Sequence, residues 1–167
     1  MSIESIDSLF NARKSAISRE YIYYFTNQDI PVYLTNYVAQ VENNIDLNEF
    51  NLILKNVVGK HDFSAFKKSG ANEFSTIRTI FQAHCEKYEY KLLTESNKTI
   101  ILNKVKIIGN SFLYQMIRNI IGSIFEILSS RNKLNENDFQ QFLFLKKRTF
   151  NFKPAPSAGL YLNKITY

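Results

Sequence analysis

The sequence predicts a single α+β domain over residues 1–167, with an antiparallel or mixed sheet packed against helices. Runs of aromatic and β-branched residues, typical of strands, alternate with segments whose apolar residues recur every three or four positions, as in amphipathic helices. Some of the strand-like runs are adjacent, as hairpins are, which favours α+β over a regular alternation. The chain length suits one hydrophobic core, and no repeat or linker divides it.

The first predicted strand covers residues 19–25, with the sequence REYIYYF. Side chains alternate along a strand, so Tyr21 and Tyr23 lie on one face and Ile22 and Tyr24 on the other. Both faces carry aromatic bulk. We therefore expect this strand to be buried on two sides.

The middle of the chain predicts a helix followed by strands. Apolar residues recur at helical spacing over 47–58, and Gly59 is expected to end that helix. Ser96 and Asn97 are predicted to form a turn between two strands. The segments after Gly59 are predicted as a short aromatic turn at 61–66 and strands at 76–81, 86–93 and 99–108.

The C-terminal third predicts two helices and a closing strand. Ser111 has the chemistry of an N-cap, and a wide apolar stripe follows it to about Leu128. A second helix is predicted over 136–146. The run GLYLNKITY at 159–167 is predicted to be the closing strand.

The charge and cysteine content limit the possible partners and compartment. The net charge of +6 suits an anionic partner, although a basic surface kept for solubility would look the same. The single cysteine, Cys85, excludes an internal disulfide and favours a reducing compartment. Acidic residues near the N-terminus argue against a secretion signal, and charged or polar residues interrupt the most apolar run. We expect a cytoplasmic protein with no membrane span.

Standard catalytic signatures are absent, so candidate functional residues are considered one by one. His61 and His84 stand alone and are interpreted as structural. Arg118 lies on a predicted helix whose other face is apolar, and a solvated arginine is the alternative to a functional one. Tyr21 is similar, because a tyrosine in an aromatic strand is usually part of the core. Helical spacing groups Arg118 with Ser111, Tyr114, Gln115 and Gly122, and the small residues Gly122 and Ser123 leave room for another backbone or a ligand.

Four stretches in the same order resemble the tRNA pseudouridine synthase A family. They are FNARKSAISREYIYYF (10–25), GKHDFSAF (59–66), SFLYQMIRNIIGSIFEI (111–127) and APSAGLYLNKITY (155–167). The resemblance implies the C-terminal half of the pseudouridine synthase fold and an isomerase that modifies tRNA without metal or organic cofactor. Members of the family detach uracil from C1′ of the ribose, turn the base, and rejoin it through C5.

The resemblance also implies roles for five residues. Tyr21 matches the tyrosine whose ring packs on the target uracil, and Arg118 matches the arginine that pairs with the catalytic aspartate. A guanidinium suits that task because its planar fork holds a carboxylate ionised in one orientation. Arg13, Arg19 and Arg78 match basic positions expected to bind RNA phosphates, with salt bridges as the alternative.

Two features depart from the family pattern. The family's aspartate loop precedes the first matched stretch, and none of the nine residues before Phe10 resembles it. The second departure is Glu20, which stands where many relatives have a basic residue and weakens contact with phosphate. Asp62 is expected to order a turn. The nucleophile's role is therefore assigned to none of Asp7, Asp29, Asp46, Asp62 and Asp138.

We therefore expect the C-terminal part of a tRNA pseudouridine synthase, inactive alone. The expected partners are tRNA and either a second copy of the chain or a separate N-terminal half, because an isolated half exposes a strand edge and apolar surface. A non-catalytic RNA-binding module is the alternative, and a structural subunit is a third. Restored activity on adding the N-terminal half distinguishes the first from the second.

Overall fold

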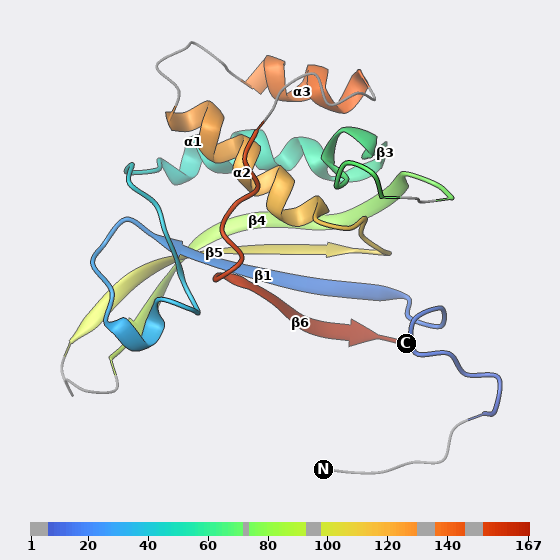
Figure 1. The fold of residues 1–167 in the computed structure, drawn as a ribbon, viewed down its shortest axis with the longest axis horizontal. Helices are drawn as coiled ribbons and strands as arrows, with labels where there is room; N and C mark the ends of the chain where they lie inside the picture. The colour runs from blue at the N-terminus through green and yellow to red at the C-terminus, as the bar shows by residue number, and fades with distance from the viewer. Residues whose placement is uncertain (1–6, 72–73, 93–97, 130–135, 146–151) are drawn as a thin grey trace.

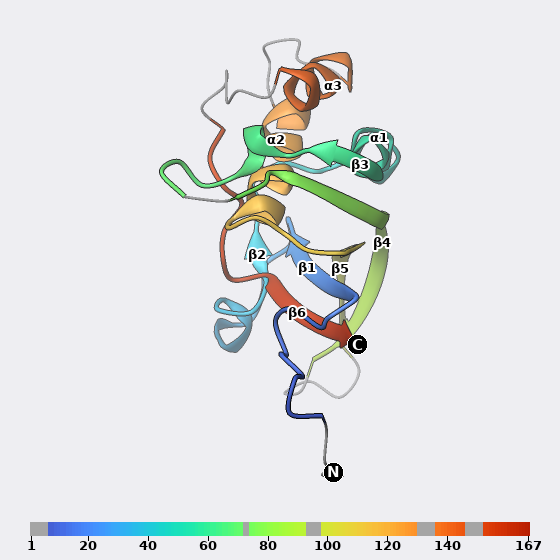
Figure 2. The same ribbon diagram turned by 90° about the vertical axis from the view of Figure 1, so that its right-hand side faces the viewer.

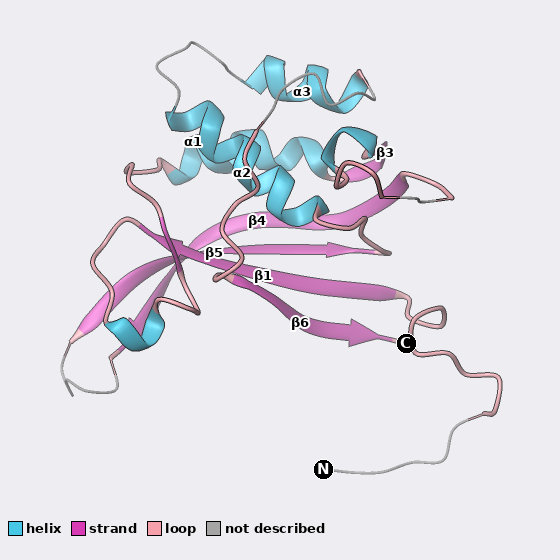
Figure 3. Ribbon diagram, viewed as in Figure 1, coloured by secondary structure: helices cyan, strands magenta, loops and turns pink. Residues whose placement is uncertain are grey.

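A mixed sheet with helices on one face forms the body of the molecule (Figures 1 and 3). The structure is a computed structural model and describes residues 7–71, 74–92, 98–129, 136–145 and 152–167. The α+β prediction is confirmed. Among these residues, no helix combines the length and the apolar character needed to cross a bilayer.

The elements follow the chain in an order that mixes strands and helices. The strands are β1 (Ser18–Thr26), β2 (Ala39–Gln40), β3 (Gly59–Asp62), β4 (Ile77–Lys91), β5 (Thr99–Gly109) and β6 (Leu160–Thr166). The helices are α1 (Leu47–Leu54), α2 (Met116–Ser129) and α3 (Glu136–Phe144), with 3-10 turns η1 (Val32–Leu34), η2 (Lys55–Val57) and η3 (Ser64–Phe66). The sheet order is β2-β1-β5-β4-β3, and β6 also pairs with β1. Only the β1–β2 pairing is parallel among the described strands.

Strand β1 is buried on both faces, as its sequence predicts. Tyr23 and Phe25 face the main core, which lies between the sheet and the helices. Tyr24 faces a second, smaller core formed with residues near η1, such as Leu34. Figure 2 shows η1, in light blue, away from the three helices. The sheet therefore has two different apolar faces.

Helix α2 begins at Met116, four residues later than an N-cap at Ser111 predicts. Ser111 does not cap it, because Ser111 lies several residues before the first helical residue, Met116. The Ser111 N–H donates to Asn110 Oδ1 at 2.7 Å. Residues 111–115 lie outside the helix, and Gln115 has a φ of 63°, which interrupts a right-handed helix. Leu113 is nevertheless buried. A buried non-helical segment therefore extended the apparent helical pattern toward the N-terminus.

The two strands predicted at 76–81 and 86–93 are one long strand, β4. It pairs with β5 over most of its length, and the register shifts between Ile80 and Gln82, which marks a β-bulge. Helix α1 ends at Leu54, earlier than predicted, and η2 continues it for one turn. Gly59 has a φ of +112° and begins β3. The turn predicted at Ser96 and Asn97 lies outside the described residues.

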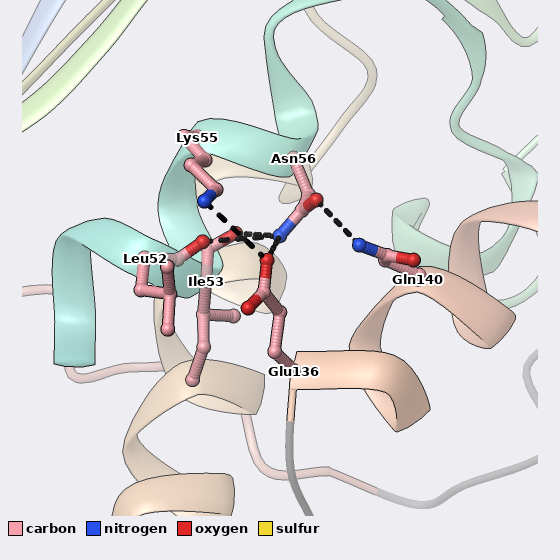
Figure 4. A network of polar contacts seen from close by, with 6 residues as sticks. All are labelled: Leu52, Ile53, Lys55, Asn56, Glu136 and Gln140. Atoms are coloured by element: carbon pink, nitrogen blue, oxygen red, sulfur yellow. Dashed lines mark hydrogen bonds and ion pairs between the residues drawn. The ribbon is translucent and has the colours of Figure 1, made fainter.

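Side-chain amides fasten the helices to the sheet and to one another. Asn51 of α1 donates to the Cys85 carbonyl at 2.8 Å and accepts from the Cys85 N–H at 2.7 Å, as a neighbouring strand would. Asn56 joins η2 to α3, since its Nδ2 donates to Glu136 Oε1 at 3.1 Å and its Oδ1 accepts from Gln140 at 3.0 Å (Figure 4). Lys55 Nζ adds an ion pair to Glu136 at 3.8 Å. These contacts orient α3 over the core.

The buried thiol of Cys85, which lies where Asn51 bonds β4, should make stability depend on pH in the alkaline range. Burial, and to a smaller extent the charge of Glu86, raises the pKa of its thiol from 9.0 to about 12. The folded state then keeps a proton that the unfolded chain releases above pH 9, so this contribution to stability is complete below about pH 9 and decreases toward pH 12. We expect iodoacetamide to label native Cys85 far more slowly than the urea-unfolded chain, as mass spectrometry would measure. Equal labelling rates would contradict the burial of this thiol.

Candidate active site

Tyr21 and Arg118 line the same groove, which has a volume of about 570 Å³. Arg13 lines it as well. The rest of the wall comes from residues 112–117, Ser157 and Leu160. The groove therefore lies where β1, the segment before α2 and the start of β6 meet, on the side of the sheet that carries the helices.

The Tyr21 ring is braced from the side. It projects from β1 toward the main core and meets the Phe112 ring edge-on, with centroids 5.1 Å apart and planes at 78°. Tyr23, two residues along, donates its hydroxyl to the Pro156 carbonyl at 2.9 Å. Burial raises the pKa of Tyr23, and the Arg118 charge offsets part of that rise. Tyr21 is thus a half-buried ring held by neighbours, with part of its surface in the groove.

Arg118 lies in the first turn of α2 and is fixed by backbone contacts. Its Nε donates to the Ala155 carbonyl at 2.7 Å, and the Ala155 N–H donates to the Arg118 carbonyl at 2.8 Å. Its two terminal nitrogens have no acceptor among the described residues. Their N–H groups therefore form a planar pair of donors that is open to a carboxylate.

Gly122 allows the chain to cross α2 close to Arg118. A Cβ added at Gly122 would lie 2.2 Å from the Lys153 carbonyl oxygen and 2.7 Å from the Ala155 nitrogen. The expectation that another backbone approaches this small residue is confirmed. Of the residues grouped with Arg118 by helical spacing, Tyr114 and Gln115 line the groove, whereas Ser111 and Gly122 do not.

Arg19 does not line the groove, but it holds the segment that carries Arg13. Its guanidinium donates to the carbonyls of Asn110 at 2.6 Å and Ala16 at 3.3 Å, and also to the Arg13 carbonyl. Asn110 in turn accepts from the Ser111 N–H, where the other wall of the groove begins. Arg19 thus connects both walls to β1, a position that the sequence did not predict.

Arg78 lies outside the groove. It is on β4, opposite His61 of β3, and its guanidinium donates to the carbonyls of Ser75 and Ile77, each at 2.8 Å. Of the five residues expected to act, the structure brings together Tyr21, Arg118 and Arg13. The RNA-binding roles of Arg13, Arg19 and Arg78 remain predictions.

The carboxylates of Asp62, Asp46 and Glu20 accept hydrogen bonds from nearby residues. Asp62 Oδ1 accepts from the Ser64 N–H at 3.0 Å, so the expected turn is confirmed. Asp46 caps α1, and Glu20 accepts from Asn163 of β6 at 2.6 Å. Within the described part of the chain, no Asp or Glu lines the groove, and no three potential metal ligands gather anywhere.

Comparison with known proteins gives matches to tRNA pseudouridine synthases. Residues 53–167 match a family described as tRNA pseudouridine synthase. A tRNA pseudouridine synthase A of Thermoanaerobacter sp. (strain X514) is 33% identical over 165 residues, 98% of this chain and 62% of the relative. The protein of the same name from Wigglesworthia glossinidia brevipalpis is 32% identical, over 100% of this chain and 59% of its own. The chain thus spans about three fifths of these relatives' length.

Proposed function

Because this chain belongs to the tRNA pseudouridine synthase family, we propose that it forms the C-terminal part of an isomerase that converts uridine to pseudouridine in tRNA. The observation that carries the proposal is the shared groove of Tyr21 and Arg118. The two residues match separate stretches of the family pattern, 97 positions apart in the sequence. A common groove is what the uracil-packing and carboxylate-pairing roles require.

Tyr21 would hold the target uracil while its bond to the ribose is remade. The base must leave the RNA stack and still be kept in place as it turns, and an aromatic face supports a ring without fixing its rotation. The edge-on contact with Phe112 keeps the Tyr21 ring from turning with the base. Arg13, which lines the same groove, would meet a phosphate beside the target nucleotide.

Arg118 would orient the catalytic carboxylate. Its Nε is occupied by the Ala155 carbonyl, so the guanidinium plane is set before any partner arrives. A carboxylate that meets the two terminal nitrogens stays ionised and points into the groove, ready to act as nucleophile or base. Since no described carboxylate lines the groove, we propose that it comes from another segment or another subunit of the enzyme.

The outer edge of β6 supports a partner for this part of the enzyme. Among the described strands β6 pairs only with β1, so its other edge presents unpaired backbone groups. Leu162 and Ile165 on this strand are 51% and 36% exposed. We propose that a separate N-terminal half, or a second copy of the chain, covers this edge. Sedimentation that shows a monomer at every concentration, with and without the N-terminal half, would contradict this.

Tritium release from C5-labelled uridine in tRNA tests the proposal. The purified chain alone is expected to give no release above background. Adding a separately produced, aspartate-bearing N-terminal half of a relative should restore release, because the groove then gains its carboxylate.

Two outcomes would contradict this function. Release by the chain alone at a rate typical of an enzyme would mean that the carboxylate lies within it. Unchanged tRNA binding with no release after the N-terminal half has demonstrably bound would favour the non-catalytic RNA-binding module instead.

A further inference from the structure

A second cavity, of about 360 Å³, lies on the face of the sheet away from the helices. Six of the chain's ten tyrosines line it. They are Tyr24, Tyr33, Tyr37, Tyr88, Tyr90 and Tyr161. We call it the tyrosine pocket. Its volume is at the lower end of the range for small-ligand sites, so it suits one ring system rather than a larger molecule.

Four separate parts of the fold build the tyrosine pocket. Tyr24 comes from β1, Tyr88 from β4, Tyr161 from β6, and Tyr37 follows η1. The Tyr24 ring lies 5.5 Å from Tyr88 and 5.8 Å from Tyr161, and the Tyr161 hydroxyl donates to the Tyr37 carbonyl at 2.8 Å. Buried Leu34, which also lines the pocket, packs with Tyr24, Tyr33 and Tyr90 in the smaller core. The rings are therefore positioned by contacts with one another before any ligand binds.

The rings are not fully covered by the protein. Tyr37 is 56% exposed, Tyr88 39% and Tyr161 37%. Aromatic side chains that serve only as core are usually buried. Several partly exposed rings around one cavity therefore indicate a binding surface. Burial is the main cause that raises the pKa of Tyr24 and of Tyr161, and the Tyr161 hydroxyl already donates to the Tyr37 carbonyl.

Beside the pocket, the Tyr88 ring lies next to an ion pair between Lys104 and Glu86. Lys104 Nζ lies 5.6 Å from the centre of the Tyr88 ring and 3.3 Å from Glu86 Oε1. A lysine already over this ring, in a chain of net charge +6, disfavours an organic cation as ligand. The same charge favours a planar ring that carries phosphate.

We propose that the tyrosine pocket binds an unstacked nucleobase. A base offers two flat faces for the rings and polar edges for the phenol hydroxyls, and stacking on aromatic side chains tolerates any base. A free nucleotide and an RNA strand both present such a ring, and competition with tRNA distinguishes them. The pocket lies on the opposite face of the sheet from the groove of Tyr21 and Arg118, so this inference does not depend on the proposed function.

NMR of the full chain with isotope-labelled tyrosine rings tests the proposal, with AMP and UMP as probes. The resonances of Tyr24, Tyr88 and Tyr161 should shift in a saturable way. Tyr88→Leu should weaken binding about tenfold, because it keeps apolar bulk but removes a stacking face. Tyr37→Leu should also weaken it, and because this ring is exposed, the variant should fold as the parent chain does. Tyr167→Leu, a matched change at a ring that packs on Phe10, should leave affinity unchanged.

Competition identifies the source of the base. Displacement of AMP by unmodified tRNA would support an RNA base, and binding of AMP without displacement would support a free nucleotide. Absence of saturable shifts with both nucleotides would overturn the proposal, as would equal affinities in all three variants. Self-association that Tyr88→Leu abolishes, with nucleotide affinity unchanged, would identify the pocket as a protein interface instead. Saturable AMP binding without tritium release by the reconstituted enzyme would count against the groove alone, which separates failure of the proposed function from failure of this proposal.

Discussion

Replacing Arg118 by lysine is expected to lower tritium release by the reconstituted enzyme about a hundredfold, the size of effect that a displacement of about 1 Å produces at a reacting group. Lysine keeps the charge, but its single ammonium cannot bond Ala155 and hold a carboxylate in one plane at the same time. The substitution therefore tests orientation rather than charge. Single-turnover release with saturating tRNA measures the chemical step.

The matched control exchanges the same two residue types elsewhere. Lys55→Arg lies on η2, outside the groove, and should leave the rate unchanged. Far-UV circular dichroism and binding of the N-terminal half verify that Arg118→Lys folds and assembles. An unchanged rate constant in the folded, assembled variant would remove Arg118 from the mechanism.

Gly122→Ala should destabilise the fold by about 1–3 kcal/mol, the usual cost of forcing extra atoms into a packed site. Helix propensity alone predicts the opposite, a gain of about 1 kcal/mol for alanine over glycine inside a helix. The clash decides the sign, because the added Cβ would lie 2.2 Å from the Lys153 carbonyl, which is backbone and must move as a whole. Urea unfolding followed by circular dichroism measures the difference.

The same substitution should also disturb the groove. Ala155, which would be pushed from α2, is the residue that bonds Arg118 in both directions. Ser129→Ala, at an exposed position of the same helix, is the control and should change stability by less than about 0.5 kcal/mol. A more stable Gly122→Ala variant would mean that residues 153–155 do not cross α2 at this distance.

The sequence predicted the fold best where local and tertiary preferences agree. Strand β1 is a run of residues that favour strands and is also central in the sheet, so its position and its two buried faces were predicted. Strand β4 was divided in the prediction because QAHC at 82–85 has weak strand propensity. Pairing with β5, rather than the residues themselves, keeps that stretch extended.

The start of α2 could not be predicted because its cause is a backbone angle. A glutamine gives no signal that it adopts a φ of 63°, and Phe112 and Leu113 continue the apolar spacing of a helix. Tyr21 and Arg118 could be chosen by resemblance, but periodicity alone did not separate them from a core tyrosine and a solvated arginine. The tyrosine pocket and the contacts of Arg19 were not predicted, since they depend on residues far apart in the sequence.

The contacts of Arg19 also constrain chain length at the N-terminal side of the groove. Its guanidinium bonds the Arg13 carbonyl six positions earlier, while Tyr21 follows two positions later on the same strand. The spacing of these three residues therefore sets how far the Arg13 wall stands from the Tyr21 ring. Residues between Arg13 and Arg19 can vary in type with little effect on this distance, whereas one inserted or deleted residue would change the width of the groove.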